Sequence, residues 1–402
     1  MSGFAPVQCI GDRVVHQGGI EAAAFNGGLK RYGGCAHNYP SYRFAGSNLI
    51  LDNGPVLQNQ ASRGNATFHH RNAALLSVAE VEAPEVLTSK DLDRRLADAL
   101  KRLKLPTGLL QRVAGVRSRR NWRRDGDMRT GTVEAGRKAL EAAGVDRSAI
   151  SVLINTSVTR DHLEPSVAVG VHHELGLPSS AMNFDITNAC LGFVNAMTLA
   201  ATLIDSGQAE YVLIVNGEDA RRVQDATVER INNLDGLSRE NFMSEFASLT
   251  LGCGAAAAVI GPADKHPEGH QLIGGVTRAA TQHHELCVGD HQGMFTDARG
   301  LLDGGLELVM DAWQDAKADF DWQSMDAYIT HQVSQLHTSA IIKAAKLDKK
   351  RVPITYPELG NVGPASLPIT LARQAPSLER GSRVLCMGVG SGLNTAMLEI
   401  QW

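Results

Sequence analysis

Three residues far apart in the 402-residue chain have side chains suited to cysteine-dependent acyl transfer. Cys190 follows the apolar segment "MNFDI", His331 follows "DAYIT", and Asn361 lies in the glycine-flanked turn "GNVGP", before a helix started by Pro364. A cysteine nucleophile needs a base and an orienting group, which are usually distant in sequence. Each residue also has a plain structural reading, because buried cysteines are usually inert and Asn beside Gly usually forms a turn. Three such placements at predicted strand ends favour a Cys-His-Asn site.

The surroundings of Cys190 distinguish it from the other cysteines. The segment "LGFVNAMTLAATLID" predicts a helix over 191–205 that ends at Gly207. A helix N-terminus presents unpaired N–H groups and a partial positive charge, so we expect it to favour the Cys190 thiolate. The remaining cysteines lie in apolar strands, a loop or irregular sequence (Cys253, Cys386, Cys287, Cys9 and Cys35).

The elements that must position these residues alternate along the chain. Strands are predicted at 73–84, 149–157, 182–186, 211–218 and 254–261, and again at 326–332, 353–359, 382–390 and 394–402. Helices are predicted at 88–103, 133–145 and 191–205, the first of them capped by Thr88 or Ser89. This alternation, repeated twice, predicts an α/β fold with sheets covered by helices. We expect two similar halves, 67–265 and 266–402, after an irregular extension or untranslated stretch at 1–66.

Composition excludes several other classes of protein. With 43% hydrophobic and 20% charged residues the chain is typical of a globular domain, and a net charge of −4 argues against nucleic-acid binding. Six scattered cysteines predict neither a disulfide framework nor a zinc site. No signal segment and no run of about 18 apolar residues is present, so we expect a cytoplasmic protein without membrane insertion.

The motifs "NACLGF", "THQ", "GNVGPAS" and "GVGSGLN" resemble the thiolase superfamily, in its ketoacyl synthase III branch, from about residue 72 to the C-terminus. The resemblance implies a five-layered α-β-α-β-α body, a homodimer, and coenzyme A thioesters as substrates without a further cofactor. Cys190 would be the acylated nucleophile, with His331 and Asn361 completing the site. The backbone N–H groups of Cys190 and Ser391 would form the oxyanion hole.

Within this branch, "LINTSVTRDHLEPSVA" and "GNVGPASLPI" resemble the subgroup that condenses two long-chain acyl-CoAs in olefin biosynthesis. The implied product is a 2-alkyl-3-ketoacid, formed without decarboxylation and passed to further olefin-pathway enzymes. Such a condensation needs a base for the α-proton. By the resemblance this base is Glu164, reaching the active site of the partner subunit, and an apolar acyl pocket would raise its pKa.

Alternatives remain at each of these points. The enzyme could instead be a decarboxylating 3-oxoacyl-ACP synthase III that uses malonyl-ACP, or an inactive partner subunit, although such subunits commonly lose the nucleophile. Cys386 in "LCMGVG" fits the second-cysteine base of degradative thiolases, whose other motifs are missing. Arg119 and Arg120, in "RSRRNWRRDGD", would hold coenzyme A phosphates or form part of a solvated charged segment. His162 and His337 are given no role.

Overall fold

The computed structural model describes residues 66–123, 128–290 and 293–402. The extension predicted at 1–66 therefore lies almost entirely outside the described residues. The strands within them are β1 (Thr67–His69), β2 (Ala73–Glu82), β3 (Glu85–Thr88), β4 (Ser118–Asn121), β5 (Ile150–Asn155), β6 (Met182–Asp185), β7 (Tyr211–Glu218), β8 (Gly254–Pro262), β9 (His270–Ala279), β10 (Cys287–Gly289), β11 (Met294–Thr296), β12 (Ala327–Thr330), β13 (Arg383–Gly390) and β14 (Asn394–Gln401).

The α-helices of the described residues are α1 (Ser89–Arg95), α2 (Ala97–Arg102), α3 (Leu109–Ala114), α4 (Met128–Ala143), α5 (Val167–Leu175), α6 (Gly192–Asp205), α7 (Arg221–Asn233), α8 (Arg239–Glu245), α9 (Ala298–Ala316), α10 (Gln335–Ala345), α11 (Tyr356–Leu359) and α12 (Ser366–Gln374). The predicted helix over 88–103 is divided at Leu96 into α1 and α2, and Thr88 caps α1 through a capping box with Asp91.

Ten of the described strands form one sheet, in which nine follow the order β12-β13-β14-β9-β2-β8-β7-β5-β6 and β1 pairs with β9 off this path. The β12–β13, β5–β6 and β5–β7 pairs are parallel, and the other pairs are antiparallel. The path joins its two parts where β2 meets β9, through only two residue pairs, Ala74 with Gln271 and Leu75 with His270. The sheet thus consists of two long sections with a short connection.

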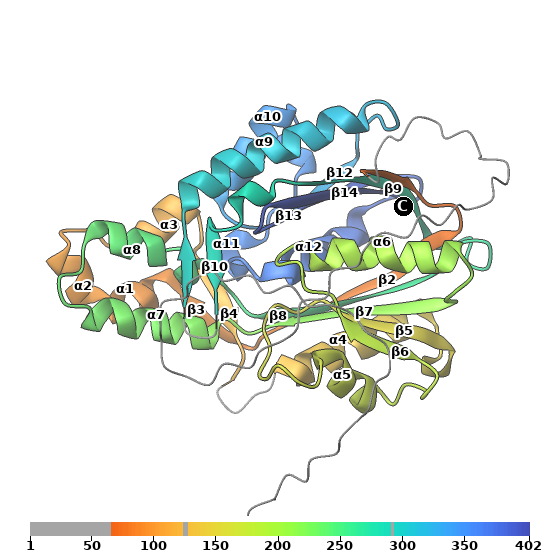
Figure 1. Cartoon of the computed structure of the whole chain (residues 1–402), viewed down its shortest axis with the longest axis horizontal. Helices are drawn as coiled ribbons and strands as arrows, with labels where there is room; N and C mark the ends of the chain where they lie inside the picture. Colours follow the sequence, from red (N-terminus) through yellow and green to blue (C-terminus); the bar gives the residue numbers. More distant parts are fainter. Residues whose placement is uncertain (1–65, 124–127, 291–292) are drawn as a thin grey trace, which may run out of the picture. The chain divides into compact units, whose positions relative to one another are not determined.

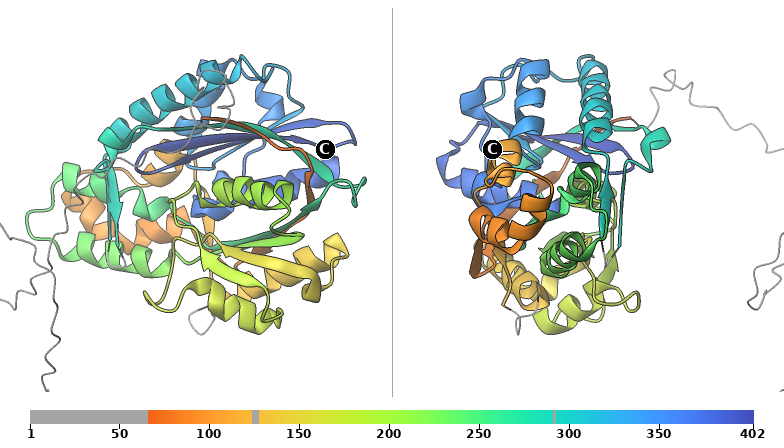
Figure 2. Two further views of the ribbon diagram at one scale, coloured as in Figure 1. Left: turned by 45° about the vertical axis from the view of Figure 1, so that its right-hand side comes forward. Right: turned by 90° about the vertical axis from the view of Figure 1, so that its left-hand side faces the viewer.

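Helices lie on both sides of each section, which gives the five-layered thiolase-like α/β fold (Figures 1 and 2). Helix α4 packs on β2, β7 and β8, and α5 packs on β5 and β6. Helices α6 and α12 form the central layer, and α9 covers β9 and β14 with α10 beside it. Parallel neighbours require crossover connections, and α5 and α6 provide them between β5, β6 and β7.

The central layer explains why β8 is rich in alanine. Every residue of "GAAAAVIGP" is buried, and α4 and α6 pack on this strand. Small side chains allow both helices to approach closely, while the larger Phe193 and Met197 of α6 fill the space between the sheet sections. Cys386 of β13 lies in the same core cluster and is fully buried.

The predicted strands differ from the structure at 353–359 and at β9, and the short strands β1, β3, β4, β10 and β11 were not predicted. The segment 353–359 was predicted as a strand, which is wrong, because Tyr356–Leu359 is the short helix α11. Pro357 lies in its first turn, where its missing N–H costs no hydrogen bond. Strand β9 was not predicted, because "HQLIGGVTRA" contains two glycines and lacks clear alternation.

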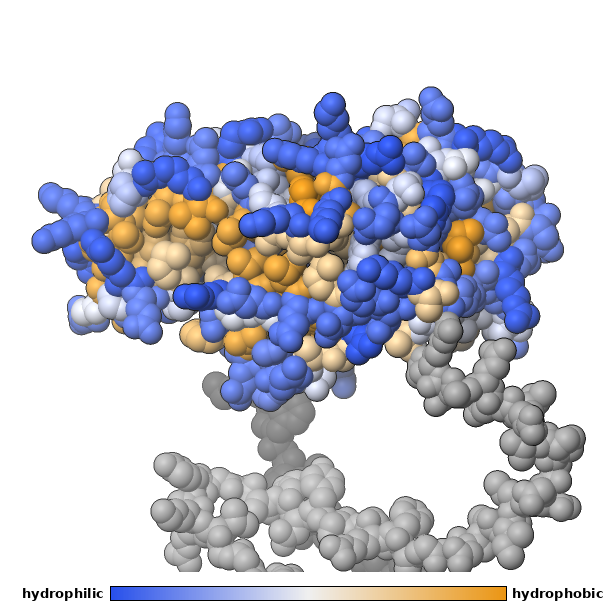
Figure 3. Space-filling view, turned by 90° about the horizontal axis from the view of Figure 1, so that it is seen from above, coloured by the Kyte–Doolittle hydropathy of each residue, from blue (hydrophilic) through white to orange (hydrophobic). Residues whose placement is uncertain are grey.

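The surface is mostly hydrophilic on the side where α9 and α10 lie, with apolar patches between charged residues (Figure 3). Scattered apolar residues are normal on protein surfaces and need no partner. Among the described residues, no helix is both long enough and apolar enough to cross a membrane.

Candidate active site

Cys190 lies on a sharp turn between β6 and α6. The preceding residue, Ala189, has a left-handed backbone with a φ of +44°, and Leu191 is the N-cap of α6. A Cβ on Gly192 would lie 3.2 Å from the carbonyl oxygens of both Thr156 and Ile186. Because this contact is tighter than most side chains accept, the first turn of α6 can approach β5 only with glycine here. The turn thus holds the partly buried Cys190 against the carboxyl ends of two strands.

The charge state of Cys190 differs from the sequence expectation. Burial, together with the nearby carboxylate of Glu218 and thiol of Cys287, raises the pKa of its thiol to about 12. The expected lowering by the helix N-terminus is therefore wrong for the unliganded chain. Cys190 precedes the N-cap, and the helix dipole acts mainly within the first turn, so the desolvation cost of the thiolate prevails.

The glycine-rich end of β13 packs directly on this turn. A Cβ on Gly388 would lie 2.5 Å from Leu191 Cδ1, and one on Gly390 would lie 2.9 Å from the Asn188 carbonyl oxygen. The side chain of Asn394 donates to Asn188 Oδ1 at 3.2 Å, which joins the start of β14 to the same turn. Ser391 follows Gly390, so its peptide lies beside the segment that carries Cys190, as an oxyanion-hole donor requires.

His331 comes from the other sheet section. It directly follows β12, and its backbone N–H donates to the Met387 carbonyl oxygen of β13 at 2.9 Å. Burial, together with the charge of His337, lowers the pKa of His331 to about 4. Its Nδ1 has no hydrogen-bond partner within the described part of the chain. The imidazole is therefore neutral at physiological pH and can donate one hydrogen bond and accept another.

The next residue, Gln332, connects His331 to the segment that leads to Asn361. Its Oε1 accepts from the backbone N–H of Thr355 at 2.9 Å, and its Nε2 donates to the Pro353 carbonyl oxygen at 3.3 Å. Gln332 is fully buried. Its Nε2 also donates to the Thr330 carbonyl oxygen at 3.0 Å. The sequence indicated no role for Gln332, because Pro353 and Thr355 lie more than twenty residues away and share no local pattern with it.

Asn361 is held by its backbone and by its side chain. Its N–H donates to the Thr250 carbonyl oxygen at 3.0 Å, and its own carbonyl accepts from Gly252 N–H at 2.9 Å. Its side-chain Oδ1 accepts from the N–H of Gly363 at 3.0 Å. This bond assigns the orientation of the amide, because a backbone N–H must face the oxygen. The Nδ2 group is left as the donor available to a substrate oxygen.

Glu218, the last residue of β7, is a buried carboxylate that sequence analysis missed. It is 5% exposed, accepts from Val158 and Thr159, and raises the pKa of Cys190. A Cβ on Gly363 would lie 3.5 Å from its Cδ atom, so the carboxylate also packs against the Asn361 turn. Burial raises the pKa of Glu218 to about 7, although its hydrogen bonds oppose this shift. Acidic residues are common at strand ends, so the sequence does not distinguish Glu218. Its burial in the structure identifies it as a residue of the site.

Glu164 is not gathered with these residues in the single chain. It lies exposed on the loop between β5 and α5, next to Leu163, whose side chain is 81% exposed. The structure therefore does not place Glu164 in an apolar pocket of its own chain. The loop directs this carboxylate to the surface.

The two predicted phosphate-binding arginines have different positions. Arg119 is fully buried, its Nη atoms lie 3.3 Å from Ser89 Oγ, and its Cβ packs beside Gly360. Burial lowers the pKa of Arg119 to about 10. Its burial removes it from contact with a coenzyme A phosphate in this structure. Arg120 is partly exposed and pairs with Glu82 at 2.6 Å.

The structure also places two further cysteines and two histidines, whereas Cys9 and Cys35 lie outside the described residues. Cys386 has a pKa raised to about 12 by burial in the core, a position that favours a passive role. Cys287 lies in the β10–β11 hairpin and influences the Cys190 thiol, which no sequence pattern indicated. His337 accepts or donates a hydrogen bond with Ser334 at 2.9 Å, and His162 is exposed.

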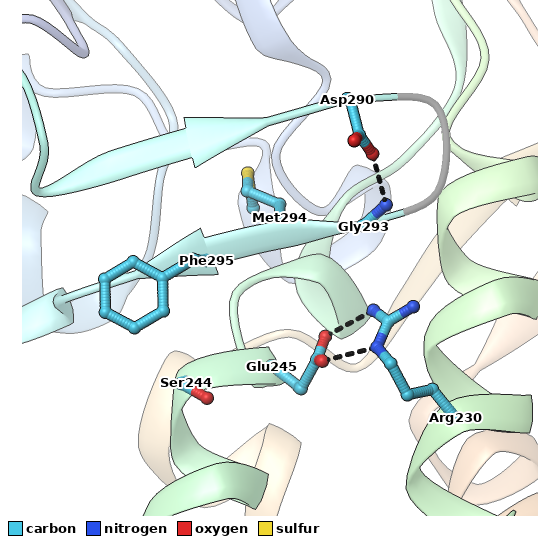
Figure 4. Close-up of a pocket in the computed structure, with 7 residues that line it drawn as sticks. All are labelled: Arg230, Ser244, Glu245, Asp290, Gly293, Met294 and Phe295. Atoms are coloured by element: carbon cyan, nitrogen blue, oxygen red, sulfur yellow. Dashed lines mark hydrogen bonds and ion pairs between the residues drawn. The ribbon is translucent and has the colours of Figure 1, made fainter. Parts of the chain in front are cut away.

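A separate cavity of about 290 Å³ lies between α7, α8 and the β10–β11 hairpin (Figure 4). Arg230 and Glu245 face each other in it, with Nε–Oε1 and Nη2–Oε2 distances of 2.6 and 2.7 Å. None of the predicted site residues lines this cavity. The described residues also contain no group of three or more His, Cys, Asp or Glu side chains that could hold a metal ion.

Comparisons with known proteins agree with this architecture. Residues 184–279 match the family 3-oxoacyl-[acyl-carrier-protein] synthase III, and residues 316–402 match the C-terminal family of the same enzymes. A crystal structure of Xanthomonas campestris OleA with bound lauric acid and lauroyl-CoA has a TM-score of 0.80 and 40% identity, and covers 83% of this chain and 100% of that chain. Other structures of that protein carry replacements of a histidine or a glutamate.

A structure described as the synthase III FabH of Xanthomonas oryzae is equally similar, with a TM-score of 0.81, 40% identity and the same coverage. Among curated proteins, the acyl-CoA:acyl-CoA alkyltransferase of Xanthomonas campestris pv. campestris is 41% identical over 336 residues, 83% of this chain and 99% of that protein. Its counterpart in Shewanella oneidensis is 33% identical, covering 81% of this chain and 97% of that protein. This chain therefore belongs to the OleA family of acyl-CoA:acyl-CoA alkyltransferases, in the ketoacyl synthase III branch of the thiolase superfamily.

Proposed function

We propose that this enzyme, an acyltransferase, condenses two long-chain acyl-CoAs into a 2-alkyl-3-ketoacid without decarboxylation. The observation that carries this proposal is the 41% identity to an acyl-CoA:acyl-CoA alkyltransferase over nearly the whole of that protein. The reaction contributes to long-chain olefin or ketone formation, and further enzymes of that pathway would take up the product.

In the first half-reaction Cys190 attacks the carbonyl carbon of one acyl-CoA. The new carbon–sulfur bond forms as the bond to coenzyme A breaks, and the thiol proton leaves with the coenzyme A thiol. The backbone N–H groups of Cys190 and Ser391 stabilise the oxyanion of the tetrahedral intermediate. Because the Cys190 thiol is neutral in the free enzyme, its deprotonation accompanies substrate binding.

In the second half-reaction a base removes the α-proton of the second acyl-CoA. The neutral His331 and the Nδ2 group of Asn361 donate hydrogen bonds to the resulting enolate oxygen. The carbanion attacks the acyl group on Cys190, so that a carbon–carbon bond forms and the Cys190 thiolate leaves. Hydrolysis of the remaining thioester gives the 2-alkyl-3-ketoacid.

We assign the base to Glu164 of a partner subunit in a homodimer. Glu164 is exposed in the single chain, and Leu163 beside it exposes 81% of its surface. Strand β6 is the last in the sheet order, and its Met182 is 57% exposed. An open strand edge with exposed apolar residues beside it is a suitable interface for a second copy.

Decarboxylative condensation with malonyl-ACP is the second candidate. It is favoured by the two synthase III family matches and by the similarity to the Xanthomonas oryzae structure. Such an enzyme obtains its carbanion by loss of carbon dioxide, so it needs no base for an α-proton.

One assay separates these functions. The enzyme is incubated with a long-chain acyl-CoA alone, or with malonyl-thioester added, and the products are identified by mass spectrometry. Formation of a 2-alkyl-3-ketoacid, or of the ketone left by its decarboxylation, from acyl-CoA alone supports the proposal. Product formed only with malonyl-thioester would assign the enzyme to fatty-acid initiation. Failure of Cys190 to acquire an acyl group would indicate an inactive partner subunit.

Coenzyme A phosphates and cellular location complete the proposal. Of the two predicted arginines, Arg120 is the one with an exposed guanidinium, and it would have to leave Glu82 to bind a phosphate. The reaction needs no metal or further cofactor. We place it in the cytoplasm, where acyl-CoAs are available, and fractionation of cells expressing the protein tests that location.

A further inference from the structure

The loop between β5 and α5 is held at both ends by a carboxylate from another strand. At its far end Asp185 of β6 accepts from the backbone N–H groups of Val167 and Ala168, each at 3.0 Å. At its near end Glu218 of β7 accepts from the N–H groups of Val158 and Thr159, at 2.8 and 3.1 Å. Glu164 lies between these anchors, in the exposed part of the loop.

At the near anchor the Glu218 carboxylate accepts both backbone N–H groups, and the N–H of Asp219 also donates to Thr159 Oγ1 at 3.2 Å. Oε1 accepts from Val158 N and from Asn216 Nδ2, the latter at 3.4 Å, and Oε2 accepts from Thr159 N and from Thr159 Oγ1, the latter at 2.6 Å. Among the described residues no basic side chain forms an ion pair with Glu218, whereas Arg160 lies 3.9 Å from Asp185. A side chain that accepts from two consecutive backbone N–H groups fixes the direction in which the chain leaves β5.

Glu218 itself has little freedom to move. Its own carbonyl oxygen accepts from the Trp122 indole N–H at 2.9 Å, and its carboxylate packs against Gly363. It is 5% exposed, so neither anchor bond competes with bulk water. The loop therefore starts from a rigid point in the core.

We propose that Glu218 is a positioning residue that orients the loop carrying Glu164, and that it acts through this loop on the active site of the partner subunit. This inference rests on the proposed function, in which Glu164 serves the partner. Glu218 also lies near Gly363 and Cys190 of its own chain, so the competing arrangement is an effect on the active site of that chain. The hydrogen bonds to residues 158 and 159 are short and directional, whereas the 3.5 Å distance to Gly363 would be reached only by a Cβ that glycine lacks.

Glu218→Gln is the informative substitution. An amide NH2 group in place of Oε2 would face the backbone N–H of Thr159, and two donors cannot bond. A protonated Glu218 avoids this conflict, because its O–H can turn toward Thr159 Oγ1. The variant thus loses one backbone anchor with almost no change in volume.

The test uses mixed dimers, purified through two different affinity tags, and measures condensation of a long-chain acyl-CoA. In the first dimer one protomer carries Cys190→Ala and the other Glu218→Gln. The single reactive thiol then receives Glu164 from a protomer with an intact Glu218. In the second dimer one protomer carries both substitutions and the other is wild type. The reactive thiol then receives Glu164 from the altered loop.

The two dimers contain the same substitutions and differ only in their arrangement. We expect the first to match a reference dimer of Cys190→Ala with wild type, within about twofold. We expect the second to be slower by about tenfold or more, because misplacing a reacting group by about 1 Å can cost 10²-fold. The reverse order would show that Glu218 acts on its own thiol, and equal rates in both dimers would remove its role. Either result overturns the inference.

A parallel pair with Glu164→Gln in place of Glu218→Gln examines the proposed function separately. If the two dimers of the Glu164 pair condense acyl-CoA at equal rates, Glu164 does not serve the partner and the proposed function fails with it. If the Glu164 dimers differ in rate and the Glu218 dimers do not, only the present inference fails.

Two further measurements exclude a general loss of structure. Glu218→Gln also removes a charge that raises the pKa of the Cys190 thiol, so acylation of Cys190 is compared with condensation in the same homodimer. Acylation should change much less than condensation, since the anchor serves the second half-reaction. Thr159→Val removes the hydroxyl that donates to Oε2 and accepts from Asp219 N–H, but it keeps the backbone N–H that donates to Oε2. This variant should also slow condensation, by less than Glu218→Gln. Acylation reduced as strongly as condensation would overturn the inference.

Discussion

Gly390 packs directly on Leu191 and leaves little room for a side chain of its own. A Cβ added to Gly390 would lie 3.2 Å from both the backbone nitrogen and the Cβ of Leu191. The same Cβ would lie 2.9 Å from the carbonyl oxygen of Asn188, a distance that real Cβ atoms essentially never show. The glycine-rich end of β13 is therefore a packing surface for the Cys190 turn.

Gly390→Ala should slow acylation of Cys190 by about tenfold or more, because the added methyl group must displace the turn that carries the nucleophile. The rate is measured by intact-mass spectrometry after rapid mixing with acyl-CoA. Gly305→Ala, in α9, is the matched control, because the added Cβ would lie 3.9 Å from Val389 Cγ1, which is an ordinary van der Waals distance. A normal rate in Gly390→Ala would show that β13 does not position Cys190.

Cys190 should gain the mass of one acyl group when the enzyme is treated with long-chain acyl-CoA. The adduct should be absent from Cys190→Ala, because the remaining thiols of the described residues are in the core or paired with other groups. Peptide mapping locates the adduct. Undiminished acylation of Cys190→Ala would make Cys287, which also influences this site, the next residue to examine.

His331→Ala and Asn361→Ala should retain acylation and lose condensation by about 10²-fold, the usual effect of removing one donor to a developing oxyanion. Asn361→Asp isolates the donor function, because it keeps an oxygen for the N–H of Gly363 and removes Nδ2. We expect it to be at least as slow in condensation as Asn361→Ala. Equal losses in both half-reactions would instead indicate a structural role, or activation of the thiol by His331.

Glu164→Gln should reduce condensation of acyl-CoA by about 10²-fold or more, because no other group would remove the α-proton. Acylation of Cys190 should continue at its normal rate. Glu210→Gln, another exposed glutamate, serves as the control. A full condensation rate in Glu164→Gln would point to a different base, with Cys386 the next candidate.

Stability should depend on pH through His331. Its pKa is lowered from 6.5 to about 4 in the folded chain, so the unfolded chain binds more protons between these values. Folding stability is therefore lost as the pH falls from about 6.5 toward 4, by about 2 kcal/mol between pH 8 and pH 5 from this group. Glu218, whose pKa is raised to about 7 in the folded chain, gains stability over the same pH range, so the His331 contribution must be measured as a difference between two proteins. Urea unfolding at fixed protein concentration should show that wild type becomes less stable relative to His331→Asn as the pH falls from 8 to 5. An identical pH dependence in both would contradict the lowered pKa.

Most strands and the Cys-His-Asn residues could be predicted from sequence because each signal is local. The apolar run before Cys190, the strand before His331 and the glycines around Asn361 are each contained in a dozen residues. The alternation of strands and helices is likewise read in short windows. The division into halves at 265/266 stays a prediction, and it falls between β8 and β9.

Burial and charge at the site depended on the tertiary structure. Glu218 became visible only when the fold brought Thr159, 59 residues away, and Gly363 against its carboxylate. The same packing buries Arg119, for which the sequence left open a phosphate ligand or a solvated charged segment, and raises the pKa of Cys190 instead of lowering it. The amino-acid sequence by itself determined which side chains could do the chemistry, because residue type and local periodicity are properties of the sequence. Solvent exclusion and the field of distant charges arise only between segments, so the fold decided how those side chains are ionised, oriented and reached.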